Sequence, residues 1–564
     1  MTARLGEVVE QPTAPPPIAG GTLLALRDGR TFVAADPDRD RLWITDTSTG
    51  AVRAVALSPG DEPGRAAEGE GVVYVALRRG GAVVTLDVGR GEITARRAVC
   101  PAPRGLAWDD TRRELIVACA GGELTSIPAE GAPRVAQLDD DLRDVVLWNG
   151  RRFVTRFRSA QLLEVGLEGE VLWRGGPPLF RDANGNSRSP GVAWRTVSHP
   201  TLGLVMLHQL SSLAPITLTD ARDAGVRSGG AYGGGAGGDT CTPGMVSSVI
   251  TTFRGQELLA ANMHLPGAIL AVDLAVHAQT FALVTPGNNI EHVVGMSFGV
   301  SSSQRVACIS ARRLTSAGPT VQSVAVAFTQ DGQVVHQRRD EAGLEILGST
   351  RRFLPFPDAP SVRDTGHAVF HAGTPAGMAC ASCHPEGGDD GRVWTFTGIG
   401  PRRTPPLRGA TSDTAPFHWD GDMTNLSHLL GDVLAQRMSA GLLTSAQQSA
   451  LSHWIDGLPV LHLKTPADAE TLARGRAVFE GPAGCADCHA GAALTNNDTV
   501  DVGTGGRFQV PQLRGLAARA PYLHDGRALT LDHRLMLNDG DRHGRTSTLT
   551  AEQRADLVRY LESL

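Results

Sequence analysis

The 564-residue sequence lacks several features that mark large classes of protein. It has no excess of basic residues, since the formal net charge is −6, and a nucleic-acid partner is therefore not expected. It has no run of about 18 apolar residues, so no transmembrane segment is expected. The N-terminus lacks the apolar core of a signal peptide, and the proline-rich stretch Pro12–Pro17 indicates a tail over residues 1–19.

Aromatic residues are scarce, at 5% of the chain, whereas the 67 glycines and 34 prolines are abundant. This composition is typical of a protein with many tight turns, such as an all-β repeat fold. At about 150 residues per domain the length predicts three or four units, or fewer if one of them is a large toroidal fold.

Residues 20–355 alternate short β-branched runs, such as TFVAAD at 31–36 and DRLWITD at 40–46, with turns rich in glycine and aspartate. A new group of strands begins about every 40 residues, which predicts an all-β propeller of about seven blades. A pair of β-sandwiches is the alternative. Later groups are less regular, and Ser228–Asp239 indicates a flexible loop. The rhythm resembles the YVTN/NHL-like propellers found beside cytochrome domains in bacterial exported proteins, which implies a docking surface.

The motif Cys-x-x-Cys-His occurs twice after a proline-rich linker, at Cys380, Cys383 and His384 and again at Cys485, Cys488 and His489. Two thiols at this spacing each add to one vinyl group of the same haem, and the adjacent histidine binds its iron. Two zinc half-sites are the alternative.

The other four cysteines are Cys100, Cys119, Cys241 and Cys308. Cys119 and Cys308 lie within apolar, strand-like runs, which favours buried, unpaired side chains. A disulfide between two of the four is the alternative in an oxidising compartment, and the sequence does not identify the pair.

The C-terminal region repeats itself, which predicts two lobes, a first at 356–464 and a second at 465–564. The matching segments are 364–370 with 473–479, 404–421 with 510–526, and 443–458 with 549–564. The last pair has apolar residues at helical spacing, so each lobe is expected to close with an amphipathic helix. A duplicated lobe predicts two covalently bound haem c groups.

These lobes resemble the bacterial di-haem cytochrome c peroxidase family, which includes the MauG-type proteins, over nearly all of residues 356–564. The resemblance is carried by GPRRTPPL at 400–407, Trp-Asp-Gly at 419–421 and VPQLRGLAARAPYLHDGRALTL at 510–531. It implies two mainly α, cytochrome-c-like lobes, with one haem that meets hydrogen peroxide and another that relays electrons. It also implies that Trp419, between the haems, helps to carry the electron.

The first lobe departs from the family pattern. The family's histidine ahead of the Gly-Pro-Arg motif is missing, which implies an open first haem and leaves His418, Met438 and solvent as candidate ligands. The family's catalytic glutamate, which precedes a methionine, is replaced by Arg437. Since peroxide cleavage requires proton movement and charge stabilisation, Asp432, Gln436 and Arg437 are the candidates, with ordinary surface positions as the alternative.

Two further positions concern metal ligands. Arg403 replaces the asparagine that follows the Gly-Pro-Arg motif in the family, which leaves a resident calcium ion doubtful. In the second lobe Met536 and His543 are the candidate distal ligands, and His543 is favoured because a low-spin relay haem needs two strong ligands. An uninvolved loop side chain is the alternative for both.

The main functional hypothesis is a di-haem peroxidase-like oxidoreductase that uses hydrogen peroxide or oxidises a partner protein. The propeller then docks that partner or the electron donor. One alternative is an electron-transfer protein with two six-coordinate haems. Another is a ligand-binding protein whose functional centre is the propeller. The haem motifs predict a periplasmic or otherwise exported protein, with Met1 in place of a signal or lipid-anchor segment.

Overall fold

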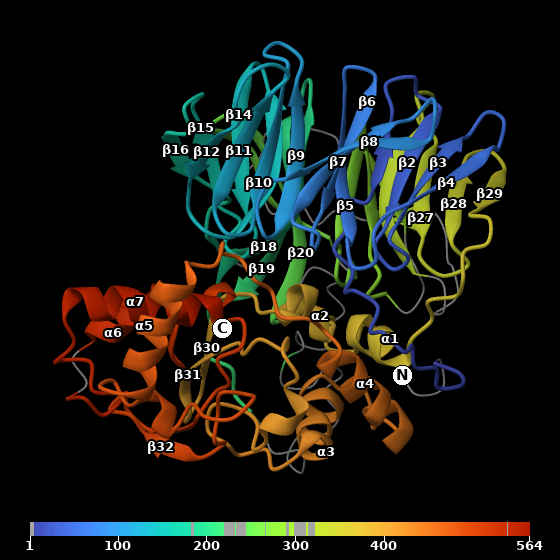
Figure 1. The fold of residues 1–564 in the computed structure, drawn as a ribbon. Helices are drawn as coiled ribbons and strands as arrows, with labels where there is room; N and C mark the ends of the chain where they lie inside the picture. Colours follow the sequence, from blue (N-terminus) through green and yellow to red (C-terminus); the bar gives the residue numbers. More distant parts are fainter. Residues whose placement is uncertain are drawn as a thin grey trace.

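The computed structural model describes residues 5–181, 185–218, 232, 244–265, 267–288, 293–297, 312–313, 322–537 and 540–564. The N-terminal part forms a ring of β-sheets, and the C-terminal region, residues 356–564, lies against one end of that ring (Figure 1). Within the described residues, no helix is long and apolar enough to cross a membrane.

The strands of the ring follow one another in chain order. The first three sheets contain β1 (Leu23–Ala25), β2 (Thr31–Asp36), β3 (Arg41–Asp46), β4 (Val52–Ala56); β5 (Pro63–Gly69), β6 (Val72–Leu77), β7 (Ala82–Asp87), β8 (Glu92–Ala98); and β9 (Pro103–Asp109), β10 (Glu114–Cys119), β11 (Glu123–Pro128), β12 (Arg134–Gln137). The remaining sheets contain β13 (Leu142–Trp148), β14 (Arg151–Arg156), β15 (Leu162–Val165), β16 (Val171–Gly175); β17 (Phe180–Arg181), β18 (Ser187–His199), β19 (Gly203–Ser212), β20 (Val246–Arg254), β21 (Glu257–His264); β22 (Asp273–His277), β23 (Thr280–Val284), β24 (Val293–Ser297), β25 (Arg312–Arg313); and β26 (Ser323–Phe328), β27 (Val334–Arg338), β28 (Gly343–Leu347), β29 (Arg351–Pro355).

These sheets form a propeller. Neighbouring sheets touch through their inner strands, in the order β1, β5, β9, β13, β18, β22 and β26, and β26 contacts β1 to close the ring. Thr22 and Gln337 reinforce the closure, because the Thr22 hydroxyl donates to Gln337 Oε1 at 2.7 Å. The expected strand TFVAAD is β2, and its side chains are buried from Phe32 onwards.

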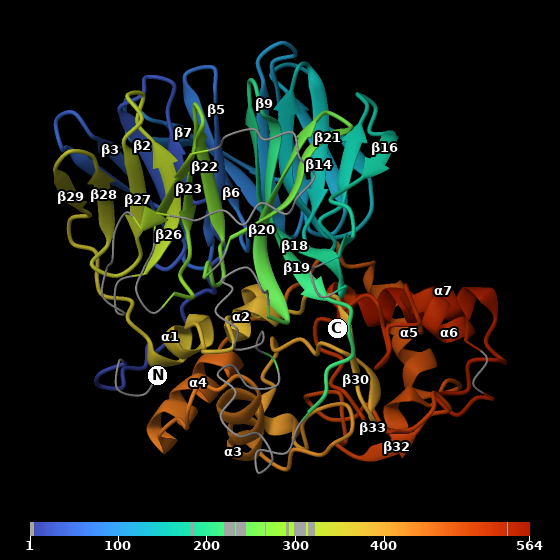
Figure 2. The same ribbon diagram turned by 180° about the vertical axis from the view of Figure 1, so that it is seen from behind.

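The predicted count of about seven blades is corrected to six regular blades and one irregular sheet. Within the described residues, six sheets have the regular four strands, and the sheet β17–β21 has five. This irregular sheet includes the long strands β18 and β19, of 13 and 10 residues. Beyond β19 the chain reaches the first lobe, where the Ile216 amide donates to Thr395 O at 2.8 Å and its carbonyl accepts from Thr397 N at 2.9 Å (Figure 2). The predicted loop Ser228–Asp239 lies outside the described residues apart from Tyr232.

The C-terminal region is less helical than expected, since most of its residues lie in loops and two short hairpins. Its longer elements are α1 (Thr365–His371), α2 (Cys380–Cys383), α3 (Leu426–Leu429), the π-helix η4 (Leu430–Arg437), α4 (Ser445–Asp456), α5 (Ala469–Glu480), α6 (Leu531–Met536) and α7 (Ala551–Ser563). Short 3-10 turns are η2 (Pro385–Gly387), η3 (Ser412–Thr414), η5 (Cys485–Asp487) and η6 (Leu516–Ala518), and the hairpins are β30 (Val393–Phe396) with β31 (Gly400–Arg403) and β32 (Thr499–Asp501) with β33 (Arg507–Gln509). Short turns and hairpins separate the helices around each cysteine motif.

The two lobes repeat one helix pair. The first helix crosses the closing helix in each, α1 against α4 and α5 against α7. A glycine allows the close approach: a Cβ at Gly366 would lie 2.2 Å from Ala450 O, and one at Gly475 would lie 2.2 Å from Asp556 O. Both closing helices begin with the same capping box, in which Thr444 and Thr550 accept from the amide three residues later.

The N-terminal segment, residues 5–19, packs against the first lobe. Val9 N donates to the Thr365 hydroxyl at 2.9 Å, and Ile18 N donates to His371 Nε2 at 3.2 Å. The indole of the fully buried Trp454 donates to Pro15 O at 2.9 Å. The segment therefore ties the start of the propeller to α1 and α4.

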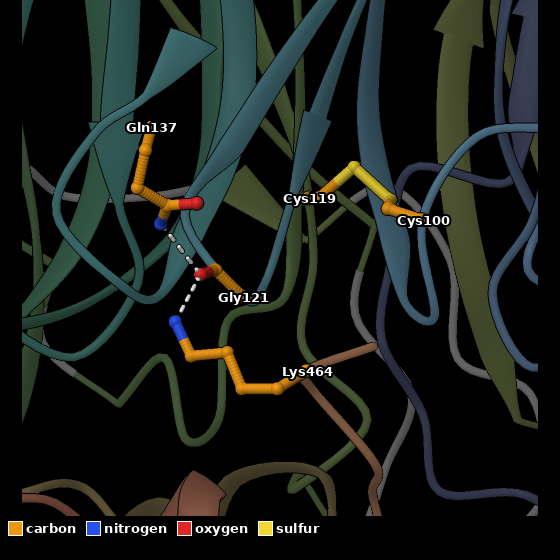
Figure 3. Close-up of a disulfide and its surroundings, with 5 residues drawn as sticks. All are labelled: Cys100, Cys119, Gly121, Gln137 and Lys464. Carbon is orange, nitrogen blue, oxygen red and sulfur yellow. Dashed lines mark hydrogen bonds between the residues drawn. A yellow bond between two sulfur atoms is a disulfide. The ribbon is translucent and has the colours of Figure 1, made fainter. Parts of the chain in front are cut away.

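A disulfide joins Cys100 and Cys119 in the third sheet (Figure 3). The interpretation of Cys119 as an unpaired side chain was therefore wrong; β10 ends opposite Pro103, so antiparallel pairing brings Cys119 beside the residues that precede β9. Cys241 and Cys308 lie outside the described residues.

The sole lysine of the chain, Lys464, lies near this disulfide and links the lobes to the propeller (Figure 3). Its ammonium group donates to Gly121 O at 2.6 Å and pairs with Asp140 at 2.5 Å. Gly121 O also accepts from Gln137 Nε2 at 3.0 Å. The segment between the two lobes is thus held against the third sheet.

Candidate haem sites and the region between them

The first Cys-x-x-Cys-His motif forms the short helix α2 and the residue after it. The four motif cysteines, two in each lobe and all described, form no disulfide, and burial raises the pKa of Cys380 to about 11. Burial also lowers the pKa of His384 to about 4, against the opposing effect of the Gly388 and Pro405 backbone. His384 is therefore neutral at physiological pH, as an iron ligand must be.

The second motif has the same chemistry. Burial raises the pKa of Cys485 to about 11 and lowers the pKa of His489 to about 4. His489 Nδ1 lies 3.1 Å from Leu494 O, which holds the imidazole and leaves Nε2 for a metal. Each motif thus combines two thiols with a neutral histidine, and this donor set fits haem c.

A second histidine lies opposite His489. The His543 ring centroid is 6.4 Å from that of His489, and the ring planes differ by 26°. Two imidazoles that bind one metal ion from opposite sides, each through a nitrogen at about 2 Å, have ring centroids about this far apart. Burial holds the pKa of His543 well below its usual value, so it is neutral as well. Met536, the other candidate, is 55% exposed.

The first lobe differs, because no histidine faces His384 in this way among the described residues. The π-helix η4 carries the candidate catalytic residues, and such helices often occur at functional sites. Asp432 and Arg437 form an ion pair, whereas Gln436 is exposed. Met438 is buried, and its carbonyl accepts from Ala376 N at 3.3 Å, so the end of η4 lies beside the chain that enters the first haem motif.

Sequence reasoning missed Tyr232, which belongs to the propeller. Arg437 Nη1 donates to the Tyr232 hydroxyl at 3.2 Å, and Tyr232 N donates to Arg437 O at 3.1 Å. Burial raises the pKa of Tyr232, and the Cys383 thiol is close enough to add to that rise. The only signal in the sequence was a lone tyrosine in a glycine-rich segment. The structure thus brings a propeller hydroxyl, Arg437 and Asp432 together near the first motif.

Trp419 lies between the lobes. Its indole donates to Arg403 O at 2.7 Å, and its carbonyl accepts from Gln509 N of the second lobe at 2.8 Å. Its ring centroid is 6.3 Å from that of His524, which stacks on Phe508 at 3.8 Å. Trp419 and His524 hold equivalent places in the repeated Trp-Asp-Gly and His-Asp-Gly sequences. His524 was also missed, and the repeat itself was the available signal.

The other candidates have local partners. His418 Nδ1 lies 3.1 Å from Asp422 Oδ1. Arg403, at the position of the family's calcium-ligand asparagine, pairs with Asp389 at 2.8 Å.

Comparisons with known proteins identify a matching family model and similar proteins. Residues 472–564 match the family model for cytochrome c. The chain is 26% identical over 305 residues to the methylamine utilization protein MauG of Methylorubrum extorquens, a match that covers 40% of this chain and 86% of that protein. It is 27% identical over 253 residues to the hydrazine synthase subunit gamma of Kuenenia stuttgartiensis, which covers 33% of this chain and 72% of that protein.

Among solved structures, a Kuenenia stuttgartiensis hydrazine synthase aligns at 14% identity over 63% of this chain and 99% of that chain, with a TM-score of 0.41. The family match identifies residues 472–564 as a cytochrome c domain, which carries covalently bound haem c. The similarity to MauG and to the hydrazine synthase subunit supports an oxidoreductase.

Proposed function

We propose that this protein is an oxidoreductase with two haem c groups, which reduces hydrogen peroxide or oxidises a docked partner protein. The first lobe is the reactive site and the second is the electron relay. The observation that carries this assignment is the contrast between the two motif histidines, because His489 faces His543 whereas His384 faces no histidine among the described residues.

In the second lobe, His489 and His543 would hold the iron of one haem. Two neutral imidazole ligands would suit rapid electron exchange without a bound substrate. Cys485 and Cys488 attach this haem, and the exposed Met536 has no part in its ligation.

In the first lobe, Cys380, Cys383 and His384 would hold the other haem, which would supply electron exchange with peroxide or with a partner. Arg437 supplies positive charge for the anion that forms when a peroxide O–O bond breaks. Asp432 holds Arg437 in place through their ion pair. The Tyr232 hydroxyl, whose pKa is raised by burial, stays protonated and can donate a hydrogen bond in place of the missing glutamate.

Trp419 occupies the route between the haems. The indole's hydrogen bond to Arg403 O and the backbone hydrogen bond from Gln509 N to Trp419 O hold Trp419 at the lobe boundary. His524, next to it, shares this position. We assign Trp419 the role of carrying an electron between the lobes.

The propeller docks the partner or the electron donor. Large apolar side chains are exposed on the outer strands of three consecutive sheets, namely Val135 on β12, Leu172 on β16, and Leu258 and Leu259 on β21. We assign the docking surface to these outer strands. The Cys100–Cys119 disulfide supports an exported, oxidising location for the whole molecule.

The decisive experiment is electron paramagnetic resonance of the oxidised protein before and after addition of hydrogen peroxide. We expect one high-spin and one low-spin ferric signal, with peroxide consuming the high-spin signal. Arg437→Leu should slow that loss strongly, while Gln436→Ala, an exposed neighbour on η4, serves as the matched control. Two low-spin signals that do not respond to peroxide would instead favour an electron-transfer protein without peroxidase activity.

A further inference from the structure

A cavity of about 70 Å³ lies where the propeller and both lobes meet. Leu142 and Phe157 of the propeller form part of its wall, Pro385 and Gly388 come from the first lobe, and Ala518 comes from the second. The 3-10 turn η2, which begins at Pro385, directly follows His384, so the cavity lies close to the first haem motif.

The wall of this cavity is strongly positive. It contains six arginines and three carboxylates, an excess of three positive charges. The arginines are Arg104, Arg143 and Arg158 from the propeller, Arg408 from the first lobe, and Arg514 and Arg519 from the second. All three parts of the molecule therefore contribute positive charge to one cavity.

The three carboxylates are already engaged. Glu386 pairs with Arg143 at 2.6 Å and lies 3.6 Å from Arg104. Asp389 pairs with Arg158 at 2.9 Å, and Asp141 lies 3.3 Å from the same guanidinium. These pairs engage all three carboxylates of the wall, so its positive charge still exceeds its negative charge by three.

Among the described residues, Arg408, Arg514 and Arg519 donate hydrogen bonds only to backbone oxygens, and the carboxylates near Arg408 and Arg519 (Glu386 and Asp389) are already paired with other arginines. Arg408 donates to Glu386 O at 2.9 Å, Arg514 donates to Gly409 O at 2.7 Å, and Arg519 donates to Gln512 O at 2.6 Å. Arg519 is 8% exposed, and its burial lowers its pKa to about 10. Burying a cation away from water is costly unless a counter-charge accompanies it.

We propose that this cavity binds a small oxyanion, held by Arg519, Arg514 and Arg408 at the junction of the propeller and the two lobes. A cavity of about 70 Å³ exceeds the ~15 Å³ that one water molecule needs, so it admits a group of several heavy atoms such as phosphate. Guanidinium groups suit oxyanions because their N–H groups match the geometry of the oxygens. The site does not depend on the peroxide chemistry proposed above.

Anion binding here has two consequences. It stabilises the contact between the propeller and the lobes, because the ligand binds only where the three parts are assembled. It also adds negative charge close to His384, which favours the oxidised state of the first haem and lowers its reduction potential. The second haem, whose motif does not line the cavity, should respond less.

The test is isothermal titration calorimetry of the full-length haem-loaded protein with inorganic phosphate at constant ionic strength. We expect one site per chain, a higher melting temperature with phosphate, and a shift of the first haem to lower potential. Arg519→Gln should weaken binding at least tenfold, since it removes a charge-assisted contact. Arg476→Gln, which removes an exposed arginine paired with Glu480, should leave phosphate binding unchanged.

A second variant covers the case in which Arg519→Gln fails to fold. Ala518→Leu fills the cavity and leaves every charge in place, so it should abolish phosphate binding while both haems remain attached. The proposal is overturned if the haem-loaded protein binds no phosphate, as it would if a haem carboxylate already occupied the cavity. It is equally overturned if phosphate binds and Ala518→Leu leaves the affinity unchanged.

Discussion

The two lobes share one architecture and differ at the face opposite the motif histidine. In both, a glycine lets the first helix cross the closing helix, and a threonine caps that closing helix. In the second lobe His543 lies opposite His489. In the first, the propeller residue Tyr232 and Arg437 lie near the motif instead. On the function proposed above, the repeated parts build the haem attachment sites, and the parts that differ set what each haem can do.

The largest effect should come from removing the thiols of one lobe at a time. Cys485→Ala combined with Cys488→Ala, and separately Cys380→Ala with Cys383→Ala, should each leave one covalent haem. Intact-protein mass spectrometry and a haem assay measure this number directly. A double variant that keeps both haems would contradict the assignment of that lobe.

Loss of His543 should make the second haem resemble the first. His543→Ala removes one of two strong ligands, so the low-spin signal should convert to high spin and the reduction potential should rise. Met536→Ala is the matched control, because Met536 is 55% exposed and should leave the spectrum unchanged. If Met536→Ala changes the spin state and His543→Ala does not, Met536 rather than His543 is the ligand.

Equivalent glycine substitutions should destabilise each lobe separately. Gly366→Ala and Gly475→Ala each place a Cβ 2.2 Å from a carbonyl oxygen of the closing helix, so the helices must move apart. We expect a loss of about 2–3 kcal/mol in the free energy of unfolding, measured by denaturant titration of each variant. Gly431→Ala has no atom within 4 Å of the new Cβ and should cost much less. Equal losses of unfolding free energy in all three variants would show that the close helix crossings do not require a glycine.

The smallest effect on structure should come from Trp419→Phe, which separates the electron route from haem attachment. The variant loses the indole bond to Arg403 O, which costs about 1 kcal/mol of stability, and it keeps both haems. Transfer between haems, followed by stopped-flow reduction, should become slower. Trp173→Phe on the propeller strand β16 controls for a general effect of losing an indole. Unchanged transfer in Trp419→Phe would remove its proposed role.

Strongly patterned segments were predicted well. The predicted runs at 31–36 and 40–46 contain β2 and β3, and the predicted closing helices are α4 and α7. The inner strands β1 and β5 were missed because LLA and PGRAAEG are short or lack β-branched residues. Their extended form depends on neighbours in the ring, since β1 contacts both β5 and β26.

The sequence by itself determined haem attachment, because five consecutive residues contain all the chemistry that links Cys485, Cys488 and His489 to one haem. It also determined the duplication of the lobes. Only the tertiary structure decided which groups come together from distant parts of the chain. Examples are Tyr232 with Arg437, Cys100 with Cys119, and the arginines of the central cavity. Their proximity depends on how the propeller packs against the lobes, and no local spacing in the sequence encodes that packing.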